Sequence, residues 1–163
     1  MDSERYRRVL EESEDFGTIF ELVKEVVYKV TGLRRAGLTL GLADLPPTIA
    51  AYHPFASNAI VLNRLILRAV QKIAKDRVEV NAYIFTVLMH EYLHSLGILD
   101  EREVRPLVHK ICAETLGERH PAVEMARKGL SEIFPRLLEA IEVSGEGVEL
   151  VKDFDRSTIT YIG

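Results

Sequence analysis

An apolar segment runs directly into a pair of histidines, and this combination restricts the fold more than any other feature of the chain. Residues 82–89 read AYIFTVLM, and residues 90–97 read HEYLHSLG. A helix that is apolar almost all round is buried on every side. Two histidines and a glutamate are costly to bury in such a helix unless they find partners. We therefore predict a buried helix over 81–97, with Asn81 as its N-cap and Gly97 at its end.

The spacing of the polar residues in this helix is typical of a catalytic zinc site. His90 and His94 lie four residues apart and share one helix face, and Glu91 is beside them. Two imidazole nitrogens at this spacing can bind one tetrahedral ion at about 2.0 to 2.1 Å, with room for a third ligand and a water. Zinc acidifies such a water, and a nearby carboxylate can take its proton. The pattern predicts His90 and His94 as ligands of zinc (Zn2+) and Glu91 as the catalytic base.

Composition indicates the size and the surroundings of the protein. A chain of 163 residues with 47% hydrophobic content fits one globular domain. The net charge of −4 argues against a nucleic-acid or anionic-membrane partner, and no apolar run approaches the roughly 20 residues of a membrane span. Cys112 is the single cysteine, and the N-terminal sequence has no apolar signal-peptide core. We therefore expect a cytoplasmic protein.

The first part of the chain is predicted to form a helix and a small sheet. Apolar residues at helical spacing predict a helix over 13–30, which Gly32 can cap. Three runs are typical of strands: residues 36–42, 48–53 and 58–63. Asn63 can then cap a helix that extends to residue 76 and precedes the metal helix.

The remainder of the chain is predicted to be mainly helical. Asp100 can begin a helix that Gly117 ends, and a further helix from about residue 122 is interrupted at Pro135. The tail over 148–162 predicts a terminal hairpin. We expect one domain, 1–163, in three parts: a helix and sheet over 1–63, backing and active-site helices over 64–97, and a helical part with the hairpin over 98–163.

The segment HEYLHSLGILD resembles the zincin metallopeptidases, in particular the metzincin-like pattern H-E-x-x-H-x-x-G-x-x-H/D. The match covers His90, Glu91, His94, Gly97 and Asp100. The resemblance implies an α+β fold, with a small, mostly antiparallel or mixed sheet, a backing helix, a buried active-site helix and a helical C-terminal part. It also implies a metalloprotease, a hydrolase whose extended peptide or protein substrate pairs with an edge strand. Gly97 would turn the chain sharply and return residue 100 to the metal.

The third metal ligand has two alternatives. Asp100 has the metzincin spacing and carries a carboxylate that zinc accepts, but Asp100 and Glu103 also resemble a capping box. His120, in the turn GERHP, is a nitrogen donor that could fold back toward the site. The histidine usual at the third position is absent, and no Met-containing turn follows.

Three functions are consistent with the motif. The first is a zinc-dependent peptidase in which Glu91 activates a water. The second is a metal-dependent endoribonuclease, although enzymes of that kind have glycine in place of Glu91 and the acidic composition here offers no phosphate-binding surface. The third is a non-catalytic, metal-binding regulatory protein. We expect a peptide or protein partner, no nucleic acid and no membrane.

Overall fold

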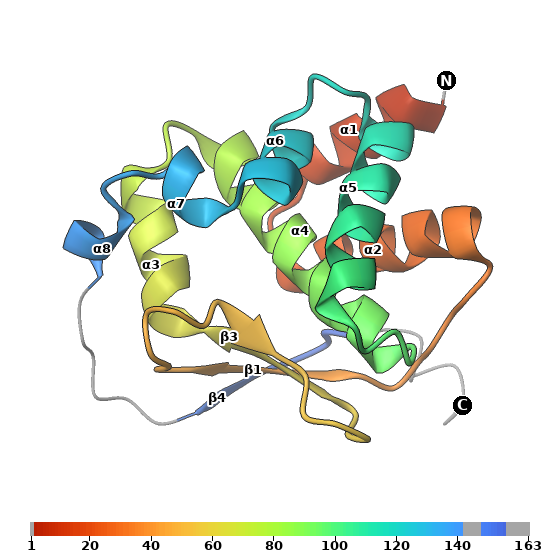
Figure 1. Ribbon diagram of the computed structural model, residues 1–163, viewed down its shortest axis with the longest axis horizontal. Coiled ribbons are helices and arrows are strands. Elements are labelled where there is room, and N and C mark those ends of the chain that lie inside the picture. Colours follow the sequence, from red (N-terminus) through yellow and green to blue (C-terminus); the bar gives the residue numbers. More distant parts are fainter. Residues whose placement is uncertain (1, 142–147, 156–163) are drawn as a thin grey trace.

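A small mixed sheet lies on one side of the molecule, and the helices gather above it (Figure 1). The computed structural model describes residues 2–141 and 148–155. Four strands have the order β2-β3-β1-β4. Their bounds are β1 Thr39–Ala43, β2 Ala51–Tyr52, β3 Ala59–Asn63 and β4 Glu149–Val151. The strands β1 and β3 are parallel, whereas β2 and β4 are antiparallel to their neighbours. The α+β class expected from the sequence is confirmed.

Four helices lie in the described chain up to and including the one that carries the site, and caps mark both ends of the second and the start of the third. Their bounds are α1 Asp2–Glu12, α2 Phe16–Thr31, α3 Arg64–Ile73 and α4 Arg77–Ser95. Gly32 ends α2 with a φ of 74°, and the side chain of Asn63 caps α3 by accepting from the Leu65 amide. The sequence did not predict α1. Among its residues only Tyr6 and Leu10 are buried, so its helical apolar pattern is weak.

The predicted start of the metal helix is wrong by one turn. Asp76, not Asn81, is the N-cap of α4, because its carboxylate accepts a hydrogen bond from the Glu79 amide at 3.0 Å. Asn81 lies inside the helix, where its buried amide donates to the carbonyls of Leu10 and Ser13, both at 2.9 Å. Asn81 therefore fastens α4 to the end of α1.

The C-terminal helices are shorter than the sequence indicated. Helix α5 (Glu101–Leu116) is capped by Asp100 and ends at Gly117 as predicted. The expected helix from residue 122 is instead three short helices: α6 Pro121–Lys128, α7 Leu130–Ile133 and α8 Leu137–Ala140. Gly129, with a φ of 88°, makes the first break, and Pro135 lies at the second. Strand β4 is one arm of the predicted hairpin, whereas residues 158–162 lie outside the described residues.

Helix α4 forms the centre of the hydrophobic core. It contacts α1, α2, α3, α5, α6 and strands β2 and β3. Its residues Phe85, Leu88, Met89, Tyr92 and Leu93 are completely buried. The apolar run of this helix therefore has packing partners around most of its circumference, whereas Thr86 and Val87 are only half-buried. Over residues 2–141 and 148–155, no helix combines the length and the apolarity that crossing a bilayer requires.

Candidate metal centre

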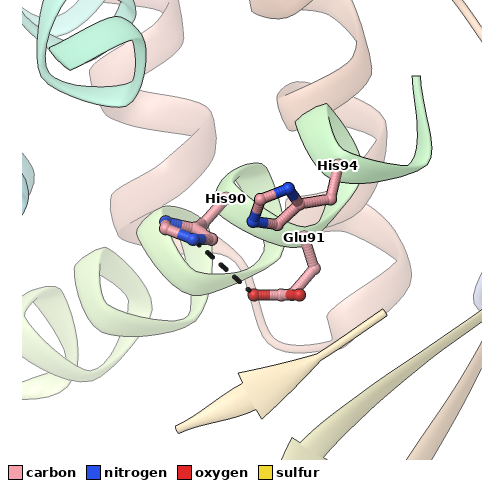
Figure 2. Close-up of side chains that lie close together, drawn as sticks. All are labelled: His90, Glu91 and His94. Atoms are coloured by element: carbon pink, nitrogen blue, oxygen red, sulfur yellow. Dashed lines mark ion pairs between the residues drawn. The ribbon is translucent and has the colours of Figure 1, made fainter. Parts of the chain in front are cut away.

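Three side chains of the motif converge at the C-terminal end of α4. Figure 2 shows His90, Glu91 and His94 next to one another, with Glu91 projecting on the side of the sheet. One potential ligand atom from each residue can be chosen such that all three lie within 4.8 Å of one another. The two imidazole rings have centroids 4.9 Å apart. The structure therefore brings together the three residues that the sequence singled out on α4.

Glu91 is the buried member of this cluster. Only 6% of the residue is exposed, and its Oε2 atom lies 4.0 Å from Nε2 of His90. Burial raises the pKa of the Glu91 carboxyl to about 7, an effect that His94 opposes and Glu101 reinforces. A carboxyl with a pKa close to neutrality can both accept and return a proton.

The orientation of His94 is set by the turn that follows the helix. Its Nδ1 atom lies 2.8 Å from the carbonyl oxygen of Ile98. Because a carbonyl can only accept, Nδ1 carries the proton, and Nε2 is the atom available to a metal. Gly97, with a φ of 100°, lies in the turn between these residues, where the resemblance implied a sharp turn.

Arg35 joins the end of α4 to the loop before β3, a contact that the sequence analysis missed. Its guanidinium donates to the carbonyl of Ser95 and to the carbonyl of Ser57, both at 2.9 Å. Its backbone amide donates to the hydroxyl of Tyr92 at 2.9 Å. Tyr92 lies between the motif residues, so the same contacts hold the helix segment that carries the site. No local sequence pattern could have revealed them, because the partners are distant in sequence.

Glu101, the first residue of α5, lies against both histidines. Its Oε1 atom is 3.0 Å from Nε2 of His90 and 2.5 Å from Nε2 of His94, and Oε2 is 3.4 Å from Nε of Arg105. Partial burial raises the pKa of Glu101, but the two histidines outweigh it and hold the pKa below its ordinary value. Sequence analysis missed this residue because the motif spacing directs attention to its neighbour, Asp100.

Asp100 is used as a helix cap and does not join the cluster. Its carboxylate accepts from the backbone amide of Arg102 at 2.8 Å and lies 3.1 Å from the guanidinium of the same residue. These bonds to Arg102 lower the pKa of Asp100. The cap-like pattern in the sequence therefore describes the position of Asp100 in the structure.

His120 is also a helix cap rather than a neighbour of the cluster. Its Nδ1 accepts from the Ala122 amide at 3.1 Å at the start of α6. Its Nε2 is buried without a hydrogen-bond partner among the described residues. Burial, with a contribution from Arg7, lowers the pKa of His120 to about 4. The ring does not line the cleft in which the cluster lies.

The cluster lies in a cleft of about 920 Å³ between the sheet and α5. Strand β2 forms one wall of the cleft, and α5 contributes Glu101 and Arg105 to another. Three exposed residues with large apolar side chains also line it: Tyr52 in β2, Phe55 after this strand and Leu99 before α5. Because β2 is the end strand of the described sheet, backbone groups along this wall lack a second strand partner within that sheet.

Comparison of the chain with protein-family models, with curated proteins and with solved structures gave no match. The chemistry of the site is therefore argued from its residues. The group His90, Glu91 and His94 could hold a metal ion, because imidazole nitrogens and carboxylate oxygens are donors that zinc accepts, and the group lies in an open cleft. A closed structural site would leave no room for a substrate.

Proposed function

We propose that this protein is a zinc-dependent peptidase with a zincin-like fold. One observation carries the proposal: His90, His94 and the buried Glu91 meet at a cleft that runs beside the edge strand β2. The order of elements supports it, because the strands β1 to β3 precede α3 and then the metal helix α4, as in the zincins that the motif resembles.

Each residue of the cluster has a distinct role in this proposal. His90 and His94 hold the zinc ion through their Nε2 atoms. When bound, zinc supplies Lewis-acid polarisation of the substrate carbonyl and acidifies a water. Glu91 accepts the proton from that water and returns it to the leaving amine. A nearby divalent cation would oppose the effect of burial and lower the raised pKa of Glu91, which favours the carboxylate form that the first step needs.

An extended peptide is the substrate that the cleft favours. The end strand β2 can pair with a peptide backbone through main-chain hydrogen bonds. The apolar side chains of Tyr52, Phe55 and Leu99 can contact substrate side chains from two walls. Both contacts would hold the peptide across the face of α4 that carries the cluster.

Substitution of Glu91 tests the proposal. The Glu91→Gln protein should retain one bound zinc per chain, measured by elemental analysis, and lose cleavage of a fluorogenic peptide library by at least about 100-fold. Glu103→Gln, an exposed glutamate on α5, is the matched control and should cleave at the wild-type rate. Unchanged cleavage by Glu91→Gln would overturn the assignment of the base.

A second substrate class separates the peptidase from its alternatives. Wild-type protein loaded with zinc should cleave peptides and leave structured RNA intact. Cleavage of RNA with no action on any peptide would replace the proposal with the endoribonuclease hypothesis. Zinc binding without turnover of either substrate would favour the regulatory protein.

A further inference from the structure

We infer that Glu101 is the third protein ligand of the metal, so that His90, His94 and Glu101 form the complete set. This inference rests on the proposed zinc site. The observation behind it is the position of one carboxylate oxygen. Oε1 of Glu101 lies 3.0 Å from Nε2 of His90 and 2.5 Å from Nε2 of His94. The Asp100 and His120 alternatives are replaced by a residue that already contacts both histidines.

The hydrogen bond made by Nδ1 of His94 directs the other ring nitrogen at Glu101. Nδ1 donates to the Ile98 carbonyl, and Nε2 lies 2.5 Å from Oε1 of Glu101. Nε2 of His90 lies 3.0 Å from the same oxygen. A carboxylate oxygen and two imidazole nitrogens that meet in this way can all bind one metal ion.

The distances require only a small adjustment of Glu101. Two ligand atoms of one tetrahedral zinc ion lie about 3.4 Å apart. The Oε1 atom is closer than this to both nitrogens, so it has to withdraw slightly. The side chain is free to do so, because 52% of it is exposed. Arg105, one turn further along α5, faces the other oxygen at 3.4 Å and keeps the carboxylate directed at the site.

The cap at the start of α5 explains why the ligand is residue 101. Asp100 accepts from the Arg102 amide and thereby begins the helix. With the Asp100 carboxylate engaged in this way, the next side chain faces the metal helix across the turn made by Gly97. One carboxylate therefore starts the helix, and its neighbour completes the site.

Zinc affinity, measured by competition with a chromophoric chelator, tests the inference without any assay of activity. Glu101→Gln should bind zinc at least about 100-fold more weakly than wild type. A loss of this size exceeds the loss of metal affinity that follows when a residue that only contacts a ligand is replaced. Glu103→Gln, with the same chemical change two positions away and exposed, should bind like wild type. Asp100→Asn, which keeps a capping side chain, should also bind like wild type. Circular dichroism of each variant verifies that it is folded.

The visible spectrum of the cobalt-substituted protein gives a second readout. Glu101→Gln should change the d–d bands, and Glu101→His should recover zinc affinity with a spectrum distinct from that of wild type, because imidazole replaces carboxylate. Wild-type affinity and an unchanged cobalt spectrum in Glu101→Gln would overturn the inference while the zinc site stands. A wild-type protein that binds no zinc would overturn the proposed function as well.

Discussion

The Nδ1 atom of His94 donates a hydrogen bond to the carbonyl of Ile98, at 2.8 Å. This bond joins the ring of a proposed metal ligand to the turn that follows its own helix. It selects the ring tautomer and restricts its rotation, which are the two functions of an outer-shell partner. The carbonyl is in position because Gly97, one residue earlier, has a φ of 100°.

Replacement of Gly97 by alanine should therefore weaken zinc binding without touching a ligand. An added Cβ would meet no atom within 4 Å, so the cost is backbone strain alone, about 1 to 2 kcal/mol. If the turn relaxes to relieve this strain, the Ile98 carbonyl moves away from His94. We expect zinc affinity to fall by about tenfold, measured by chelator competition.

A glycine elsewhere provides the matched control for this variant. Gly32 has a φ of 74° and also has open space around its Cβ position, but it ends α2 and does not line the cleft. Gly32→Ala should lose a similar amount of stability in urea and keep wild-type zinc affinity. Equal losses of zinc affinity in both variants would mean that general destabilisation, and not the His94 contact, is responsible.

The sequence predicted those parts of the site that depend on local spacing. His90, Glu91 and His94 belong to one helix, so their shared position follows from the helical repeat. Glu101 could not be found in this way. The sequence predicted the start of α5, but whether residue 100 or 101 faces the histidines depends on the path of the turn before it, which spacing along the sequence does not give.

In the fold, as in the site, the features set by neighbouring residues in the sequence were predicted, and those set by contacts with distant residues were not. The caps Gly32 and Asn63 act on their own helices and were predicted. Asn81 was misassigned because asparagine is a common cap, whereas its amide contacts carbonyls at the end of α1, 68 and 71 residues away in sequence. The interaction of Arg35 with the end of α4 could not be predicted from the sequence either, because Arg35 and Ser95 are 60 residues apart.

Glu91 should destabilise the metal-free protein above neutral pH. Its pKa is about 7 in the folded protein against an ordinary value of 4.5, so between these pH values the folded state binds more protons than the unfolded state. Stability therefore falls as pH rises from 4.5 to about 7, and the loss is complete above that. In chelator at about pH 8, Glu91→Gln should be more stable than wild type by roughly 1 to 3 kcal/mol.

Urea unfolding of the two proteins at about pH 5 and about pH 8 measures this effect. The difference between them should nearly vanish at the lower pH, where the Glu91 carboxyl is mostly protonated in the folded protein. A Glu91→Gln variant that is less stable than wild type at the higher pH would show that the buried carboxylate has a compensating partner when metal is absent.

Zinc should stabilise the folded protein by an amount that depends on its concentration relative to its Kd. A ligand that binds only the folded state contributes about 2.7 kcal/mol at a concentration 100 times its Kd. The melting temperature should rise on addition of zinc and fall again with a chelator. His90→Ala should remove most of this response, whereas His109→Ala, a histidine that lines the same cleft without joining the cluster, should retain it. An equal response in the two variants would argue against His90 as a ligand.

His120 should affect acid stability and leave zinc binding unchanged. Its pKa is about 4 in the folded protein against an ordinary value of 6.5, so between these pH values the unfolded chain binds more protons than the folded protein. Neutral His120 therefore contributes fully to the free energy of unfolding above about pH 6.5, and this contribution is lost as pH falls toward about 4. The loss is no more than about 3 kcal/mol. His120→Asn can still cap α6 and should therefore lose less stability than wild type between about pH 7 and about pH 5, in parallel urea titrations.

The zinc affinity of His120→Asn at neutral pH should equal that of wild type, because the His120 ring bonds to Ala122 and lies outside the cleft. A sharp loss of zinc in this variant would make His120 a ligand and contradict the position of the ring at the start of α6.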